Sequence, residues 1–250
     1  MHITFSFDIE GDSTIRLPSA NLHLFQSMLY SLLPDDIAGK IHDDGFDSEG
    51  RRMKLFSFGW PVAESCPQFG KGTMIFPLPI KLTVSTPLND LAKGFSVGAL
   101  IKDDIRIGNN HLTCTKTEKR EQKVNSDSVL VQTLSPITCY ESMDKDGRNF
   151  TRYLSPYDDE FQTGIYSNLM RKFKLLYPDR EIKNENFKII PRGRLKERIS
   201  MFEKGGSFPI KGWWGRFLLK GDREILQTAI DCGLGSKNSS GWGCLTIIQN

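Results

Sequence analysis

The sequence predicts an α+β fold built from two tandem ferredoxin-like domains. Short runs of alternating apolar and polar residues indicate strands, and longer segments with apolar residues every three or four positions indicate helices. In each half of the 250-residue chain these segments follow the order β-α-β-β-α-β, the order of a ferredoxin-like module. Residues 117–128 are polar and nearly free of apolar side chains, so we place the boundary there, between domains 1–122 and 123–250.

Local signals set the ends of the elements in the first half. Pro34 ends the first helix because proline lacks a backbone N–H, and Pro87 opens the second because its fixed φ suits a first helical turn. Asn109 and Asn110 mark a tight turn between two strands. The expected elements are strands over 2–9, 53–60 and 73–84, helices over 19–33 and 87–101, and a hairpin over 105–116.

The second half has a similar order, with a longer first helix and one additional expected strand. Phe161, Ile165 and Leu169 recur at helical spacing within that helix. The expected elements are strands over 128–140, 185–192, 198–203, 212–221 and 244–249, and helices over 158–176 and 223–232.

The composition, with 38% hydrophobic and 25% charged residues, is that of an ordinary soluble protein. No apolar run approaches the roughly 18 residues that span a bilayer, and the first residues lack the layout of a signal peptide. We therefore expect a cytoplasmic protein with no membrane contact. The five cysteines and four histidines are scattered without ligand spacing, which predicts neither a disulfide framework nor a metal site.

Positive charge is concentrated late in the chain, although the net charge is only +3. Residues 188–223 contain ten basic residues and three acidic ones. Such a stretch could neutralise several phosphates of a nucleic acid, or it could be an ordinary solvated surface. Four of its basic residues alternate, so an extended strand would project them on one face as a row: Arg192, Arg194, Lys196 and Arg198.

A glycine-rich loop, GLGSKNSSGWG over residues 233–243, lies between the last predicted helix and the last predicted strand. Its glycines could cap the helix, form a flexible turn, pack closely on a sheet, or offer bare amide groups to a phosphate. A Walker loop and a dinucleotide fingerprint both follow a strand and precede a helix, so neither fits this order or spacing. The glycines are Gly233, Gly235, Gly241 and Gly243.

The spacing of this loop resembles the C-terminal signature of the RAMP superfamily, in the version found in CRISPR-associated repeat-processing endoribonucleases. Three further segments resemble that family's motifs in the family's order: IHDDGF over 41–46, KLFSF over 54–58 and TLSPI over 133–137. The resemblance covers nearly the whole chain. It implies two ferredoxin-like domains, each similar to an RNA-recognition fold, with the repeat RNA held across a basic surface.

The resemblance also implies an enzyme that cuts CRISPR repeat RNA without a metal or other cofactor and releases guide RNAs (crRNA). The 2′-OH of RNA can serve as the nucleophile, so the products would carry a 2′,3′-cyclic phosphate and a 5′-OH. His42 matches the family's catalytic histidine, and Tyr30 and Lys54 match the residues that accompany it in some members. Without the motif, His42 would be an ordinary surface histidine, Tyr30 a packing residue and Lys54 a solvated lysine.

Two other functions remain open at this point. The chain could be a catalytically silent RNA-binding subunit of a CRISPR complex, or a small-molecule enzyme of ferredoxin-like fold. The expected partner is the repeat RNA, with other CRISPR-associated subunits as further candidates, and a monomer and a homodimer are equally compatible with the sequence.

The expected RNA contacts lie in the second domain, and the expected catalytic histidine lies in the first. The candidate RNA-binding residues are Arg192, Arg194, Lys196, Arg198, Lys211, Arg216 and Lys237. Trp213 and Trp214 could stack on an unpaired base, and at least one of them is expected to be a core residue. An acidic cluster next to His42 would repel phosphate unless its carboxylates turn away: Asp43, Asp44, Asp47 and Glu49.

Overall fold

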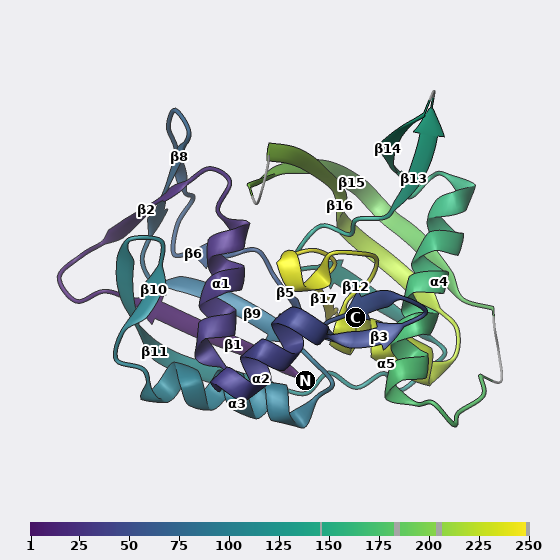
Figure 1. The fold of residues 1–250 in the computed structure, drawn as a ribbon, viewed down its shortest axis with the longest axis horizontal. Helices are drawn as coiled ribbons and strands as arrows, with labels where there is room; N and C mark the ends of the chain where they lie inside the picture. Colours follow the sequence, from purple (N-terminus) through teal and green to yellow (C-terminus); the bar gives the residue numbers. More distant parts are fainter. Residues whose placement is uncertain (146, 183–185, 204–206, 249–250) are drawn as a thin grey trace.

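The computed structural model describes residues 1–145, 147–182, 186–203 and 207–248. The molecule consists of two halves that lie side by side, each with a sheet and helices packed on it (Figure 1). Within the described residues, no helix is both long and apolar enough to cross a membrane.

The first half contains a sheet, two long helices and several short hairpins. Its elements are β1 (His2–Asp8), β2 (Thr14–Pro18), α1 (Leu22–Leu32), α2 (Asp35–Gly39), the π-helical turn η1 (Lys40–Asp44), β3 (Phe46–Ser48), β4 (Arg51–Met53), β5 (Ser57–Phe58), β6 (Val62–Ala63), β7 (Gln68–Phe69), β8 (Thr73–Pro77), β9 (Ile80–Ser85), α3 (Asn89–Ile101), β10 (Ile105–Ile107) and β11 (Asn110–Arg120). The sheet has the order β10-β11-β1-β9-β5 with antiparallel neighbours, and β6 also pairs with β9.

The second half repeats this plan. Its elements are β12 (Ser128–Thr133), β13 (Tyr140–Lys145), β14 (Arg148–Tyr153), α4 (Asp159–Leu176), β15 (Lys188–Glu203), β16 (Ser207–Lys220), α5 (Arg223–Cys232), the 3-10 turn η2 (Asn238–Ser240) and β17 (Leu245–Ile247). The sheet has the order β15-β16-β12-β17, again with antiparallel neighbours.

Both sheets have the strand order of a ferredoxin-like module. In the first sheet, β1 lies between β9 and β11, and β5 flanks β9. In the second sheet, β12 lies between β16 and β17, and β15 flanks β16. One helix follows the first strand and the other follows the third. The predicted fold class, two tandem ferredoxin-like modules, is therefore confirmed.

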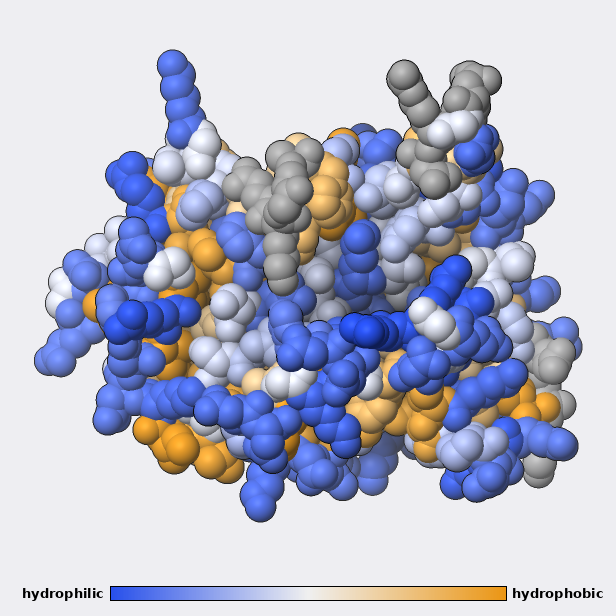
Figure 2. Space-filling view, in the orientation of Figure 1, coloured by the Kyte–Doolittle hydropathy of each residue, from blue (hydrophilic) through white to orange (hydrophobic). Residues whose placement is uncertain are grey.

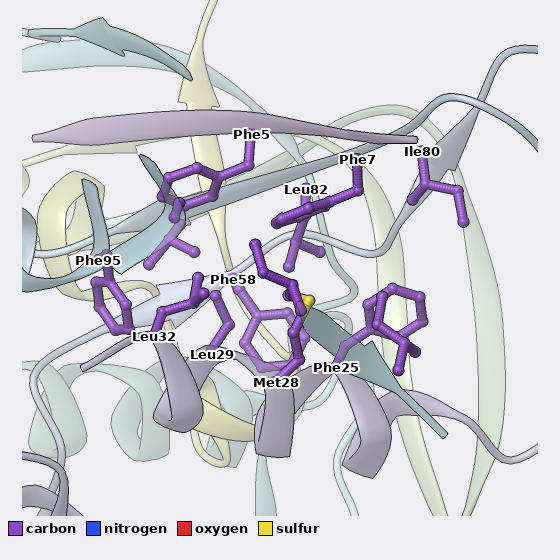
Figure 3. Close-up of a cluster of buried hydrophobic side chains, with 14 of the residues drawn as sticks. Phe5, Phe7, Phe25, Met28, Leu29, Leu32, Phe58, Ile80, Leu82 and Phe95 are labelled. Atoms are coloured by element: carbon purple, nitrogen blue, oxygen red, sulfur yellow. The ribbon is translucent and has the colours of Figure 1, made fainter. Parts of the chain in front are cut away.

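The core of the first half forms where β1 faces helix α1. Phe5 and Phe7 alternate along β1, so both point to the same face of the sheet, where they meet Phe25, Met28 and Leu29 of α1 (Figure 3). These five side chains are at most 1% exposed. A second core of the same kind joins α4 and α5 to the other sheet.

The two halves also share core contacts. Ile210 and Trp242 come from the second half but are buried in the core of the first. Trp60 donates a hydrogen bond from Nε1 to the carbonyl of Gly241 at 2.8 Å, and His2 forms a buried hydrogen bond through Nε2 with the carbonyl of Leu245 at 2.9 Å. The glycine-rich loop is thus held against the first half.

Two strands predicted in the first half are shorter than expected. The run over 73–84 forms two strands, β8 and β9, because Pro77 and Pro79 cannot donate to a sheet ladder. The run over 53–60 is a strand only at Met53, the last residue of β4, and at Ser57–Phe58, since Leu55 has a φ of +52°, which turns the chain out of the extended conformation. Lys54, which was expected within that strand, therefore lies between β4 and β5.

The second half differs from prediction in its hairpins. The two strands predicted over 185–192 and 198–203 are one long strand, β15, whose register shifts near Gly193, with its φ of +72°. The strand predicted over 128–140 ends at Thr133. The β13–β14 hairpin was not predicted, and neither was the β3–β4 hairpin of the first half, since their strands carry too few apolar residues to show a pattern.

Candidate active site

The structure brings Tyr30, His42 and Lys54 together from three different elements. Tyr30 lies near the end of α1, His42 in the turn η1, and Lys54 between β4 and β5. The ring centroids of Tyr30 and His42 are 5.2 Å apart with an interplanar angle of 83°. The Lys54 ammonium donates to the backbone carbonyls of Ile41 and His42. These contacts connect all three residues.

The motif around His42 has a clear structural basis. Ile41 is buried at 4% exposure and anchors η1 to the core, while Gly45 ends the turn with a φ of +61°. A Cβ on Gly45 would come within 2.8 Å of the Met53 carbonyl oxygen, so a larger residue would push β4 away. This anchoring leaves the His42 side chain 51% exposed.

A carboxylate orients the His42 ring. His42 Nδ1 lies 2.7 Å from Oδ1 of Asp43, and this hydrogen bond holds the pKa of Asp43 below its usual value. When Nδ1 carries the proton that bonds Asp43, Nε2 is left with a lone pair that can accept a proton.

Tyr30 remains protonated in its environment. Burial raises the pKa of its phenol to about 12, and a hydrogen bond with the Ser239 side chain partly opposes that effect. At neutral pH the phenol is therefore a hydrogen-bond donor. Ser239 belongs to the glycine-rich loop, so the second half of the chain helps to position Tyr30.

A cavity of about 810 Å³ lies where the two halves meet. Lys54 and Ser239 line it, which places the Tyr30, His42 and Lys54 site beside it. Hydrophilic side chains cover this junction, over β3 and beside α4 (Figure 2). Six cationic side chains contribute to the cavity wall: Arg51, Arg52, Lys54, Arg171, Lys172 and Lys237.

The four glycines of the loop allow close packing rather than free amide groups. A Cβ on Gly235 would approach the Thr138 carbonyl oxygen to 2.2 Å, and one on Gly243 would approach that of Leu234 to 1.9 Å. The amides of Leu234, Ser236 and Gly243 donate to backbone carbonyls at 2.8–2.9 Å. Two of the alternatives raised by the sequence are therefore found together: the glycines pack closely on neighbouring backbone, and Gly233 caps α5 with a φ of +78° and an N–H that donates to the Ala229 carbonyl at 3.0 Å.

Lys172 holds this loop in place, and its role was not predicted. Its ammonium donates to the carbonyls of Gly233 and Gly235 and to Oδ1 of Asn238, at 2.8, 3.1 and 2.6 Å. The side chain is 3% exposed, and burial lowers its pKa to about 8. The sequence did carry a signal, because Lys172 falls on the helix face that Phe161, Ile165 and Leu169 define.

A second basic region lies on β15 and β16. A hollow of about 360 Å³ there is lined by five of the predicted cations together with Trp214: Arg192, Arg194, Lys196, Arg198 and Arg216. The shifted register keeps these cations together, because Arg192 pairs with Arg216 and Lys196 with Trp214.

Lys211 does not join this group. It pairs with Ile199, whereas Arg198 pairs with Gly212, so strand alternation puts Lys211 on the opposite face. There it forms an ion pair with Glu197 at 3.2 Å. Lys237, the remaining candidate, lines the cavity beside the active site and lies over the Tyr140 ring at 5.3 Å.

Trp213 and Trp214 have different environments. Trp213 packs against the second core and donates from Nε1 to the Leu154 carbonyl at 3.0 Å. Trp214 contacts Trp60, with centroids 5.8 Å apart, at the basic hollow. Trp213 therefore packs against the core without being fully buried, and Trp214 is also half-buried, so neither is the fully buried core residue that was expected.

Two carboxylates of the acidic cluster have specific partners. Asp43 bonds His42, as described above, and Glu49 forms an ion pair with Arg171 at 3.2 Å. Within the described ranges no three His, Cys, Asp or Glu side chains are grouped to hold a metal ion. A metal-independent reaction stays a prediction.

Two ferredoxin-like sheets with a glycine-rich loop packed between them define a protein of the RAMP class. A family model described as "CRISPR associated protein Cas6, C-terminal" matches residues 118–247. The chain belongs to the Cas6 family, which confirms its resemblance to the CRISPR repeat-processing endoribonucleases.

Relatives in two archaea match most of the chain. The CRISPR-associated endoribonuclease Cas6 2 of Methanocaldococcus jannaschii is 26% identical over 246 residues, covering 92% of each chain. The CRISPR-associated endoribonuclease Cas6 of Pyrococcus furiosus is 23% identical over 249 residues, covering 96% of this chain and 87% of the relative.

Solved structures share the fold over the full chain. A Cas6-related protein from Pyrococcus furiosus superposes with a TM-score of 0.83 at 18% identity, covering 100% of this chain and 99% of the other. A RAMP protein described as binding different RNA substrates has a TM-score of 0.79 at 18% identity, with full coverage of both chains.

Proposed function

We propose that this protein binds CRISPR repeat RNA and cleaves the precursor transcript into guide RNAs without a metal ion. The observation that carries the proposal is the meeting of Tyr30, His42 and Lys54 beside a cavity lined with cations. Relatives named as Cas6 endoribonucleases support the activity. A product complex among the similar structures supports the binding of RNA.

The proposed reaction is a transfer of the phosphoryl group within the RNA. The neutral His42 imidazole accepts the proton of a 2′-OH, the 2′-oxygen attacks the adjacent phosphorus, and the bond from phosphorus to the 5′-oxygen breaks. The imidazolium then protonates the departing 5′-oxygen. The products are a 2′,3′-cyclic phosphate and a 5′-OH, and no water is consumed in this step.

Tyr30 and Lys54 have supporting roles in this proposal. The Tyr30 phenol keeps its proton, because its pKa is about 12, and can donate a hydrogen bond to a phosphoryl oxygen. Lys54 uses two of its ammonium protons to hold the backbone of the His42 turn. Its third proton and its charge are available to the phosphate, whose negative charge increases in the transition state.

We also propose that the RNA runs from this site onto the hollow lined by Arg192, Arg194 and Arg216. Clustered cations neutralise phosphates, and Trp214 beside them provides a ring on which an unpaired base can stack. In this proposal the chain divides into a catalytic domain, 1–122, and an RNA-binding domain, 123–250.

The test is a cleavage assay in EDTA with a repeat-containing transcript, followed by analysis of the product ends. We expect cleavage at one linkage, giving a cyclic phosphate and a 5′-OH. A 3′-OH and a 5′-phosphate, or cleavage that needs an added metal, would contradict the proposed mechanism. Tight binding without cleavage would instead identify a silent RNA-binding subunit.

A further inference from the structure

The cavity beside the active site contains a buried polar atom without a partner. Asn168 lies on α4, is 9% exposed and lines the cavity. Its side-chain oxygen Oδ1 is buried and has no hydrogen-bond partner in the described part of the chain. Buried amide oxygens are normally satisfied, so this atom indicates a place where a ligand supplies a donor.

The charges around this atom favour an anion. Arg52 of β4 and Arg171 of α4 both line the cavity. Arg171 also forms an ion pair at 3.2 Å with Glu49, whose side chain is 71% exposed and does not line the cavity. Glu141 also lines the cavity, but it pairs with Arg152 at 2.8 Å, which compensates its charge. A ligand with phosphates and a hydrogen-bond donor would satisfy both the cations and the unpaired oxygen.

The position of the cavity relates this ligand to the reaction. Lys54 belongs both to the site with His42 and to the cavity wall, so a molecule in the cavity lies next to the reacting linkage. The volume of about 810 Å³ lies within the range of pockets that enclose small ligands, and is ample for one nucleotide.

We propose that the cavity takes one unstacked nucleotide of the RNA, next to the cleaved linkage. Asn168 Oδ1 accepts a hydrogen bond from an N–H group of the base, and Arg52 and Arg171 bind the flanking phosphates. Proteins that read RNA by sequence commonly splay out single bases in this way. The proposal rests on the proposed endoribonuclease function and adds Asn168, Arg52 and Arg171 as substrate-binding residues.

The experiment pairs changes in the protein with changes in the RNA. A set of repeat RNAs, each with one abasic nucleotide near the cut, is cleaved under single-turnover conditions by the wild type and by Asn168→Ala. We expect one abasic position to slow the wild type at least tenfold. Asn168→Ala should cleave intact RNA about tenfold more slowly, with no further loss at that position, because the same contact is already absent.

Two further variants complete the experiment, one as a control and one as a second test of Asn168. Asn89→Ala changes an exposed asparagine at the start of α3 and should behave as the wild type with every RNA. Asn168→Ser keeps a small polar side chain and repeats the test if the alanine variant does not fold, as judged by its thermal unfolding.

Arg171→Gln tests the phosphate contact. We expect Arg171→Gln to cleave the normal RNA more slowly than the wild type does. This difference in rate should disappear when the phosphate beside the sensitive nucleotide is replaced by a neutral methylphosphonate. If this variant is equally impaired on both RNAs, Arg171 does not bind that phosphate.

The outcomes separate the two proposals. If the wild type cuts no repeat RNA, the proposed function fails. If the wild type cuts but no abasic position slows it more than twofold, the cavity does not hold a base and this inference is wrong. It is also wrong if the abasic position slows Asn168→Ala by the same factor as it slows the wild type.

Discussion

The edge of one ring meets the face of the other where Tyr30 and His42 pack, with centroids 5.2 Å apart and planes at 83°. This contact joins the end of α1 to the turn η1 and keeps the imidazole beside a phenol that retains its proton. The glycine-rich loop touches the same phenol through Ser239. Residues from both halves of the chain therefore determine the geometry of one small site.

Replacing His42 should remove catalysis and spare RNA binding. We expect His42→Ala to slow cleavage in EDTA by roughly 10²–10⁴-fold, the usual contribution of a general acid–base group, with Kd changed less than threefold. His111 provides a matched control, because it is also exposed and also lies 2.7 Å from an aspartate, Asp104, at the edge of the first sheet. Equal losses in His42→Ala and His111→Ala would remove His42 from the mechanism.

Tyr30→Phe should lower the rate without unfolding the protein. The ring and its packing remain, so only the hydroxyl group and its hydrogen bond with Ser239 are lost, and we expect a decrease of about 10–100-fold in kcat. Because the pKa of Tyr30 is about 12, the wild-type rate should show no titration of this group between pH 7 and pH 10. A rate change with an apparent pKa near 10 that disappears in Tyr30→Phe would contradict this assignment. Tyr157→Phe, at an exposed position, is the control.

Lys172→Met should destabilise the glycine-rich loop. The substitution leaves three buried oxygens without their donor, and we expect a loss of about 2–3 kcal/mol in the free energy of unfolding. Cleavage should also fall, because the loop carries Ser239. Lys174→Met, two positions along the same helix and exposed, should change stability by less than about 0.5 kcal/mol. Urea unfolding of both variants measures the difference, and equal stability would show that the buried lysine is not needed to hold the loop.

The basic hollow should control the salt dependence of RNA binding. Arg192→Ala combined with Arg194→Ala should weaken binding and reduce the slope of log K against log salt by about 1.4, or about 0.7 for each phosphate contact to single-stranded RNA. Lys211→Ala is the matched control, since Lys211 lies on the other face of the same sheet and forms an ion pair with Glu197. An unchanged slope in the double variant would place the RNA elsewhere.

Stability should fall as the pH drops from about 6.5 to about 4. Burial lowers the pKa of His2 to about 4, so in this range the unfolded chain takes up a proton that the folded chain does not. By pH 5 the loss from this residue should reach about 2 kcal/mol. His2→Gln keeps a donor for the Leu245 carbonyl but does not titrate, so its stability should depend less on pH. Urea unfolding at pH 7.5 and pH 5.0 gives the comparison, and the same pH dependence in both proteins would show that His2 is not the cause.

Much of the fold could be predicted because its helices and central strands have regular apolar patterns. The spacing of Phe25 and Leu29 predicted α1, and the spacing of Phe161 and Ile165 predicted α4. Hairpins such as β3–β4 escaped prediction because tertiary contacts and a tight turn stabilise them. Glu49 and Gly50 both have positive φ in that turn, which no apolar pattern signals.

The candidate site was predicted in part. Local motifs identified Tyr30, His42 and Lys54, and their meeting in space fits the prediction. Asn168 and Lys172 were missed, although both occupy the apolar face of α4, where a polar residue is unusual. Lys211 was grouped with the other cations by its position in the sequence, yet strand register places it on the opposite face.

The sequence by itself determined the two ferredoxin-like modules and the glycine spacing, because periodicity and backbone freedom are local properties of the chain. Only the tertiary structure decided which cations share a cavity, which loop amides are already bonded, and that Lys172 and Ser239 of the second half support a site built on the first. Those relations depend on how two sheets pack and in what register their strands pair, and contacts between separate elements leave no local pattern in the sequence.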